Sequence, residues 1–213
     1  MSITPSSTPA SNPPRTGGRL RNEEAHHSVL EATAALLVEN GYGALTIEGV
    51  AKRANVAKST VYRWWKSKPT LVMDAYAHGA ATHVPEPDTG TLAGDLTAFV
   101  ADLYRIGRDP VRAEALTGLM AEAQLDPAFA EPFRAWVATR RDIVATLLSR
   151  AVTREELPAA TDLAHAIDLV FGPFWYRLLV AHAPLDPADA EAHVTTVLRG
   201  LTGHRPTSSS TAP

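Results

Sequence analysis

The helical spacing of apolar residues is the feature that most limits how this chain can fold. Over residues 22–40, apolar side chains recur on one face of the segment, and Gly41 follows as a left-handed helix stop. The spacing stays helical as far as about residue 203, and no series of alternating strands with hairpin turns interrupts it. The sequence therefore predicts an all-α fold of about nine helices.

Three helices are expected to follow the first one at close intervals. Thr46 can cap the first of these, which ends near Ala54, and Asn55 marks the turn after it. The second covers residues 58–64, and the third covers residues 68–81, where a proline suits the first turn.

Five more helices are expected in the remaining sequence. Their start signals are Asp109-Pro110, Asp126-Pro127, Pro158 and Asp186-Pro187. The helices are placed near residues 91–107, 110–125, 127–152, 160–182 and 187–202. A proline inside a helix removes one backbone hydrogen bond, so Gly172-Pro173 predicts a bend in the fourth of these helices.

Composition suggests two ordered units between two tails. Residues 1–18 and 204–213 are rich in Pro, Ser and Thr, so we expect both segments to be disordered. The segment HVPEPDTG, residues 83–90, has the composition of a linker. We therefore expect one domain over residues 19–82 and a larger helical domain over residues 83–203.

The net charge of −3 hides an uneven distribution of charge. All four lysines lie between residues 52 and 68, and residues 46–68 hold six basic groups against the single carboxylate of Glu48. A solvated helix face usually mixes the two signs, so this concentration predicts a binding site for a polyanion such as nucleic acid.

Several features point to a soluble protein of the cytoplasm. The chain has no cysteine, and its first residues include no apolar stretch long enough for a signal peptide. Residues 163–182 are the most apolar segment, but Asp168 and Arg177 interrupt it, which disfavours a membrane span. We expect a cytoplasmic location and no membrane partner.

Residues 46–68, TIEGVAKRANVAKSTVYRWWKSK, fit a helix-turn-helix, whose second helix enters the major groove of DNA. The inward positions are Ile47, Val50, Ala51, Val56, Val61 and Trp65. The outward positions of the second helix are Lys58, Ser59, Thr60, Tyr62 and Arg63, which can reach base edges and phosphates. We expect Tyr62, Trp64, Lys68 and the hydroxyl of Thr46 to contact the phosphate backbone.

This motif resembles the N-terminal domain of TetR-family transcriptional regulators. The similarity covers residues 29–72, with Gly41-Tyr42 at the end of the first helix, Thr46 at the start of the second and Ser67-Lys68 opening the fourth. The recognition-helix element of the family, Lys-x-Thr-x-Tyr, is present as Lys58, Thr60 and Tyr62. The resemblance implies a second helical domain that binds a ligand and forms a dimer.

Two sets of residues in the second domain are candidates for those tasks. The expected ligand contacts are the aromatic, aliphatic and Met side chains Phe99, Leu103, Met120, Phe133, Trp136, Val137, Phe171 and Trp175. The expected homodimer contacts are Ile167, Val170, Phe174, Leu178, Val194, Val197, Leu198 and Leu201. Ordinary packing within one chain explains both sets as well, so both alternatives stay open.

The sequence favours a regulator over other classes of protein. The histidines have no metal-binding spacing, and no nucleophile elbow or phosphate-binding glycine loop occurs, so we expect no metal, no cofactor and no enzymatic activity. The predicted function is a sequence-specific repressor that a small molecule releases from a palindromic operator. The alternative is a DNA-binding structural protein without a sensing function, which would have the same basic charge.

Overall fold

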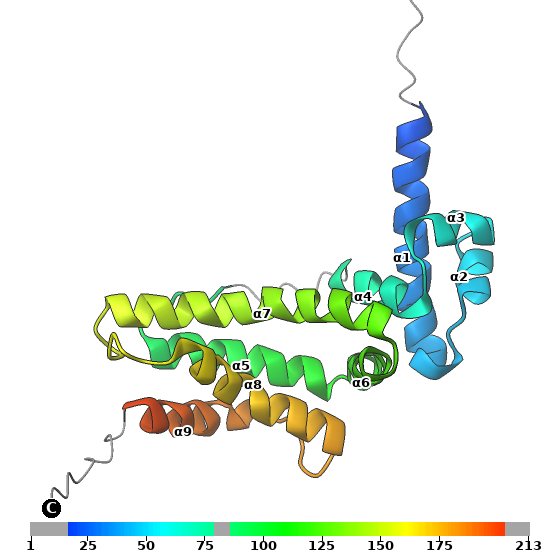
Figure 1. The fold of residues 1–213 in the computed structure, drawn as a ribbon. Coiled ribbons are helices and arrows are strands. Elements are labelled where there is room, and N and C mark those ends of the chain that lie inside the picture. The colour runs from blue at the N-terminus through cyan, green and yellow to red at the C-terminus, as the bar shows by residue number, and fades with distance from the viewer. Residues whose placement is uncertain (1–16, 79–85, 203–213) are drawn as a thin grey trace, which may run out of the picture.

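The computed structural model describes residues 17–78 and 86–202, and the regular elements in these two segments are all helices (Figure 1). The first four are α1 (Gly17–Ala44), α2 (Ile47–Arg53), α3 (Lys58–Trp64) and α4 (Lys68–His78). The others are α5 (Leu92–Arg108), α6 (Pro110–Leu125), α7 (Pro127–Thr153), α8 (Leu163–Val180) and α9 (Ala190–Thr202), with a 3-10 turn, η2 (Pro187–Asp189), before α9. The prediction of an all-α fold is confirmed.

The helices form two units that meet at α6. In Figure 1, α1 to α3 stand at one end of the molecule, and the long helices α5 and α7 lead away from them, with α8 and α9 along one side. Helix α6 contacts α1 and α4 of the first unit as well as α5 and α7 of the second. The first unit is therefore attached to the second by helix packing as well as by the connecting chain.

Most predicted helix starts are close to the observed ones because their capping residues were recognisable. The carboxylate of Asp109 accepts a hydrogen bond from the Arg112 N–H at 3.0 Å, and that of Asp126 accepts one from Ala128 at 2.9 Å. In both helices a proline follows the cap. A backbone N–H at this position has no partner within the helix, so the proline loses no hydrogen bond. The starts predicted from these Asp-Pro pairs are confirmed.

The largest differences lie at the starts of α1 and α8. Helix α1 begins at Gly17 instead of near Asn22, so the last two residues of the predicted N-terminal tail are helical. Helix α8 begins after Asp162, whose carboxylate accepts from the His165 N–H at 3.1 Å, and not after Pro158. The bend expected at Pro173 does not divide α8. The remaining tail residues, 1–16 and 204–213, and the first part of the linker, 83–85, lie outside the described residues.

Two apolar clusters form the core. One fills the space among α5, α7, α8 and α9, and includes Tyr104, Leu147 and Phe174. The other begins in the first unit, with Val29 and Trp65, and continues into side chains of α6 and α7. Those side chains are Ala115, Leu119, Ala123, Phe129 and Phe133. The apolar core of the first unit is therefore completed by the second.

Most of the expected dimer contacts are buried within a single chain. Ile167, Val170, Phe174, Val194 and Val197 are buried in the core of a single chain. Leu178, Leu198 and Leu201 are partly buried against the same core. Packing within one chain accounts for the burial of these five residues, because α5 packs against both α8 and α9.

The end of α1 fits closely against α6. Gly41 has a φ of +74°, as the predicted helix stop requires, and one further turn follows it to Ala44. The ring of Tyr42 lies so near Gly118 of α6 that a Cβ at Gly118 would come within 2.4 Å of it. Burial, together with the negative charge of Glu122, raises the pKa of Tyr42. This contact needs a residue without a side chain at position 118.

We predict that Gly118→Ala lowers the free energy of unfolding by roughly 1–3 kcal/mol, because the added methyl group overpacks the Tyr42 contact. Gly200→Ala is the matched control, since a Cβ there would meet nothing within 4 Å in another helix. The control should leave stability unchanged or raise it by about 0.5–1 kcal/mol. Urea unfolding followed by circular dichroism measures both, and equal stability of the two variants would contradict the prediction.

Candidate nucleic-acid interface and adjoining cavity

The turn between α2 and α3 is built around Asn55. Its φ of +53° lies in the left-handed region, which asparagine adopts more readily than most residues. The Val56 N–H donates to the Ala51 carbonyl at 3.0 Å and closes the turn. Helix α3 then begins at Lys58 after Ala57, which makes no side-chain capping bond. The two helices and their turn have the arrangement expected of a helix-turn-helix.

The inner face of this motif contains the predicted core residues. Ile47, Val50, Ala51, Val61 and Trp65 are buried, and Val56 is partly buried against them. Trp65 is 3% exposed, and its Nε1–H donates to the Asp74 carboxylate at 2.7 Å. Its ring also lies 4.7 Å from that of His26 in α1, measured between centroids. Trp65 therefore fixes α3 to both α1 and α4, through contacts that the sequence did not reveal.

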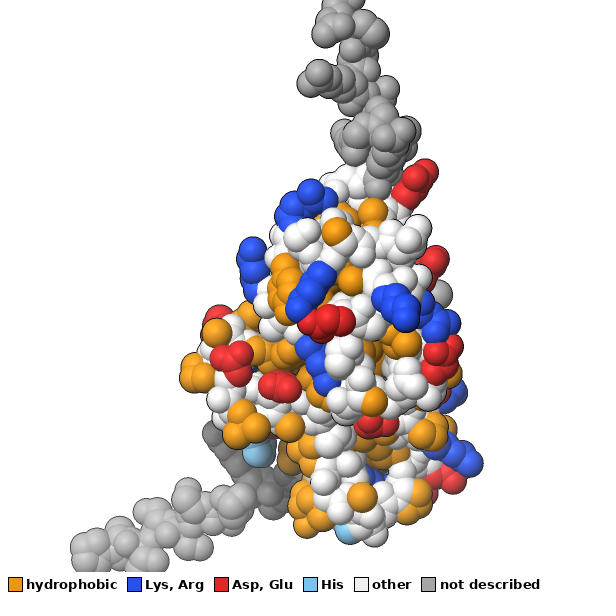
Figure 2. Space-filling model, turned by 90° about the vertical axis from the view of Figure 1, so that its right-hand side faces the viewer, with side chains coloured by type: hydrophobic (Ala, Val, Ile, Leu, Met, Phe, Trp, Pro, Cys, Tyr) orange, Lys and Arg blue, Asp and Glu red, His pale blue; other side chains and the backbone are white. Residues whose placement is uncertain are grey.

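The outer face of α3 presents polar and cationic groups to solvent. Lys58, Ser59, Tyr62 and Arg63 are exposed, and Thr60 is partly buried. Figure 2 views the side of the molecule that carries α2 and α3, and Lys and Arg side chains are spread over its upper half with a few Asp and Glu side chains among them. The predicted division of α3 into an apolar and a cationic face is present.

Lys58 is paired with Glu48 in this structure. The ammonium group of Lys58 donates to the Glu48 carboxylate, and it lies 5.5 Å from the centre of the Tyr62 ring. The hydrogen bond lowers the pKa of Glu48 and raises that of Lys58. Both side chains are well exposed, so the pair is weak, and a phosphate or a base edge can replace the carboxylate.

Trp64 is less available than the sequence suggested. It is partly buried, with its ring 5.3 Å from that of His26 and 5.5 Å from that of Trp65. The guanidinium of Arg63 lies 5.1 Å from the centre of the Trp64 ring and donates to the Asn22 side-chain oxygen at 2.9 Å. Trp64 therefore packs against α1 and supports the exposed Arg63.

Two of the predicted phosphate contacts have structural partners as well. The hydroxyl of Thr46 accepts from the Gly49 N–H at 3.1 Å and so caps α2, as expected. The ammonium group of Lys68 lies 4.3 Å from the centre of the Tyr42 ring and donates to the Gly43 carbonyl at 3.3 Å. Lys68 therefore lies at the junction of α4 with the end of α1, close to the contact with α6.

A cavity of about 400 Å³ lies between the helices of the second unit and α4 of the first. Six of the eight predicted ligand contacts line it, namely Phe99, Leu103, Trp136, Val137, Phe171 and Trp175. The other wall residues are Tyr76, Ala77, Glu86, Ile106, Leu116, Arg140, Ile143 and Phe174. Its size and its aromatic wall are typical of a site for a small organic ligand.

The other two predicted contacts, Met120 and Phe133, are not on the cavity wall. Both pack in the cluster that the first unit shares with α6 and α7. Phe174, expected at a dimer interface, lines the cavity instead. Arg140 and Tyr76 were missed because the prediction considered apolar residues of the second domain, whereas Tyr76 comes from α4.

The cavity lies where the two apolar clusters meet. Tyr76, Trp136 and Trp175 pack against both clusters, and all three line the cavity. The rings of Tyr76 and Trp136 meet edge to face, with centroids 5.8 Å apart. One wall of the cavity is therefore part of the same helix, α4, that begins beside the helix-turn-helix.

Together these features define a helix-turn-helix DNA-binding protein with a helical domain that contains a cavity. Residues 29–75 match the family described as bacterial regulatory proteins, tetR family, and residues 86–197 match the tetracyclin repressor-like C-terminal domain. The chain belongs to the TetR family, and it is a DNA-binding transcriptional regulator.

Three similar proteins agree with this assignment. An uncharacterised helix-turn-helix regulator of Bacillus subtilis, YdeS, is 32% identical over 86% of this chain and 93% of its own length. The DNA-binding transcriptional repressor TetR of Mycobacteroides abscessus is 30% identical over 79% of this chain and 88% of its own. The crystal structure of the TetR-family regulator SCO0332 has a TM-score of 0.73 and 33% identity, over 83% of this chain and 98% of that one.

We predict that Trp65→Ala and Tyr62→Phe both reduce DNA binding, but for different reasons. The first leaves a cavity in the core and should cost about 3–5 kcal/mol of stability. The second removes only an exposed hydroxyl, so it should leave the fold intact and weaken binding by about 0.5–1.5 kcal/mol for each hydrogen bond removed. Thermal unfolding by circular dichroism and DNA binding by fluorescence anisotropy separate the two effects. Equal melting temperatures for the two variants would contradict the burial of Trp65.

Proposed function

We propose that the protein is a repressor that binds a palindromic operator as a homodimer and leaves it when a small molecule fills the cavity. The observation that carries this proposal is the position of Tyr76, which belongs to α4 and forms part of the cavity wall. A ligand that displaces Tyr76 moves α4, and with it the hydrogen bond between Trp65 and Asp74 that holds α3. The similarity to a protein described as a repressor supports the sign of the regulation.

The residues of the interface have separate tasks in this proposal. Lys58, Ser59 and Thr60, in the first turn of α3, act partly on base edges and so select the sequence. Tyr62, Arg63, Trp64, Lys68 and the hydroxyl of Thr46 act on phosphates and position the helix. The role of Trp64 is indirect, because its partly buried ring packs against the guanidinium of Arg63 and supports that side chain.

The competing function is a DNA-binding structural protein that senses nothing. Such a protein would have the same basic surface, but that function does not explain an aromatic cavity next to α4. The stretch with net positive charge is also confined to one short motif, residues 46–68, while the remainder of the chain carries net negative charge and is unsuited to wrapping DNA. A regulator that acts on DNA in this way works in the cytoplasm, which we propose as its location.

The dimer is proposed to form through the outer face of α8. This helix is long and apolar enough by composition to cross a membrane, but a core helix of a soluble protein passes the same test. Only 28% of it is buried within one chain, and Tyr176, Leu179 and Val180 are exposed. A Cβ at Gly172 would meet nothing within 4 Å, so a second helix can approach closely there. A two-fold dimer also matches the symmetry of a palindromic site.

We predict that Thr60→Val and Lys68→Met weaken operator binding in different ways. The Thr60 variant should cost roughly 1–3 kcal/mol for each specific base interaction that it removes, and it should change the preferred base at one position of each half-site. The Lys68 variant should weaken binding to operator and random DNA alike. It should also lower the slope of log affinity against log salt by about one for each phosphate interaction removed in each subunit.

The measurement is a competition titration at several salt concentrations with operator variants, after circular dichroism has shown that each variant is folded. Methionine is similar to lysine in length but carries no charge, so a change in the salt slope reports the missing charge. If both variants lose the same affinity on every sequence, the basic stretch is a general anchor and the proposed sequence-specific repressor is wrong.

We predict that Leu179→Arg converts the dimer into a monomer at micromolar concentration. Leu179 is 43% exposed in one chain, and a charge at a covered apolar position costs far more than one in water. Val38→Arg is the control, because Val38 is an exposed apolar residue of α1, away from α8. Light scattering after size exclusion should give half the wild-type mass for the first variant only. A monomeric wild-type protein would rule out the dimer.

A further inference from the structure

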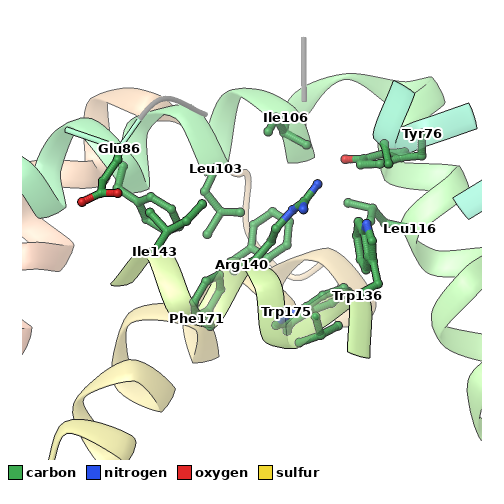
Figure 3. A pocket seen from close by; sticks show the side chains of 14 residues that line it. Tyr76, Glu86, Leu103, Ile106, Leu116, Trp136, Arg140, Ile143, Phe171 and Trp175 are labelled. Carbon is green, nitrogen blue, oxygen red and sulfur yellow. The ribbon is translucent and has the colours of Figure 1, made fainter. Parts of the chain in front are cut away.

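Three hydrogen-bond donors meet at one end of the cavity. Figure 3 shows the hydroxyl of Tyr76, the indole nitrogen of Trp136 and the guanidinium of Arg140 directed toward the same region, whereas Glu86 lies at the opposite end. The guanidinium of Arg140 is 5.0 Å from the centre of the Trp136 ring, and the ring of Tyr76 meets Trp136 edge to face at 5.8 Å. The donors come from α4 and α7, so the tertiary structure alone brings them together.

In the part of the chain that the structure describes, one of these donors has no acceptor, and a second has no carboxylate to balance its charge. The Nε1 atom of Trp136 is buried and has no hydrogen-bond partner, and an indole N–H can only donate. Arg140 donates to the Thr139 hydroxyl at 3.0 Å, but no carboxylate within the described residues 17–78 and 86–202 forms an ion pair with it. Buried polar groups in proteins are normally satisfied, so an unpaired donor on a cavity wall indicates a ligand that accepts.

The hydroxyl of Tyr76 adds a further donor. Burial raises the pKa of Tyr76 to about 12, against the opposing effect of the positive charges of Arg112 and Arg140. The phenol therefore keeps its proton near neutral pH. Burial also lowers the pKa of Arg140, although a guanidinium still carries its charge in proteins. This end of the cavity is positive and rich in donors, and Asp109, the acidic group nearby, is exposed to solvent.

The rest of the cavity has a different character. Its wall is made mainly of aliphatic and aromatic side chains, among them Phe99, Phe171 and Phe174. The carboxylate of Glu86 at the far end is paired with Arg150 at 3.2 Å, so it is neutralised without a ligand. The cavity therefore offers one site for a negative charge and an apolar space for the rest of the molecule.

We propose that the effector is a small organic carboxylate with a single charge, whose head group accepts from Arg140, Tyr76 and Trp136 and whose apolar body fills the remaining space. This inference rests on the proposed function, because it names the ligand of the same cavity. A cationic amphiphile would meet the guanidinium of Arg140 at the end of the cavity where the donors gather. A neutral alcohol of the same size would occupy the apolar space and leave the charge of Arg140 unpaired.

The test compares matched ligands on the full-length protein. Decanoate, decanol and decylamine form one series, and 2-naphthylacetate, 2-naphthylethanol and 2-naphthylethylamine form a second series with a flat body. Affinity is measured by isothermal titration calorimetry. In at least one series, the carboxylate should bind wild-type protein about tenfold more tightly than the alcohol or the amine, the difference expected for one charge-assisted hydrogen bond.

Variants assign that preference to the three donors. Arg140→Gln should reduce carboxylate affinity by about tenfold or more and leave alcohol affinity unchanged, while Tyr76→Phe and Trp136→Phe should each give a smaller loss. Arg134→Gln is the matched control, since Arg134 lies on the same helix but is exposed and paired with Glu131. It should bind like wild type. Circular dichroism establishes that each variant is folded.

The outcomes separate this inference from the proposed function. If the alcohol or the amine binds as tightly as the carboxylate, or if Arg140→Gln binds the carboxylate normally, the carboxylate proposal is wrong. If such a ligand also releases the protein from its operator, the proposed regulator still stands. If no carboxylate in either series binds with a Kd below about 1 mM, the carboxylate proposal is wrong as well. Operator binding by anisotropy then tests the regulator independently.

Discussion

The structure depends on the packing of two very short helices onto longer ones. Helices α2 and α3 have seven residues each, a length at which an isolated helix is unstable in water. They are held by the burial of Val50, Val61 and Trp65 against α1 and α4. This apolar cluster continues into α6 and α7, so the surface that meets DNA is positioned partly by the second domain.

This shared core also provides the coupling that the proposed repressor requires between its two sites. The cavity lies between the two clusters, and Tyr76, Trp136 and Trp175 belong to its wall and pack against both. A ligand that occupies the cavity as proposed would therefore act on side chains that already pack against the first domain, without a long path through the protein. The tight contact of Tyr42 with Gly118 is a second direct link between the domains.

The division of α3 into a buried and an exposed face was largely predictable, because a helical repeat fixes which side chains share a face. The buried positions of Val61 and Trp65, and the exposed positions of Ser59 and Tyr62, follow from that repeat. The partners of these side chains were not predictable. The pairing of Lys58 with Glu48 joins two helices, and the packing of Trp64 against His26 depends on where α1 crosses α3.

The sequence by itself determined the helices, the Asp-Pro starts, the motif that meets DNA and the apolar faces of the second domain. Only the tertiary structure decided what covers those faces. Val170 and Val194 are covered by the same chain, Met120 and Phe133 belong to the shared core, and Tyr76 and Arg140 meet at the cavity. The physical reason is that periodicity shows that a face must be buried, whereas a cavity is the space left between helices that are distant in sequence.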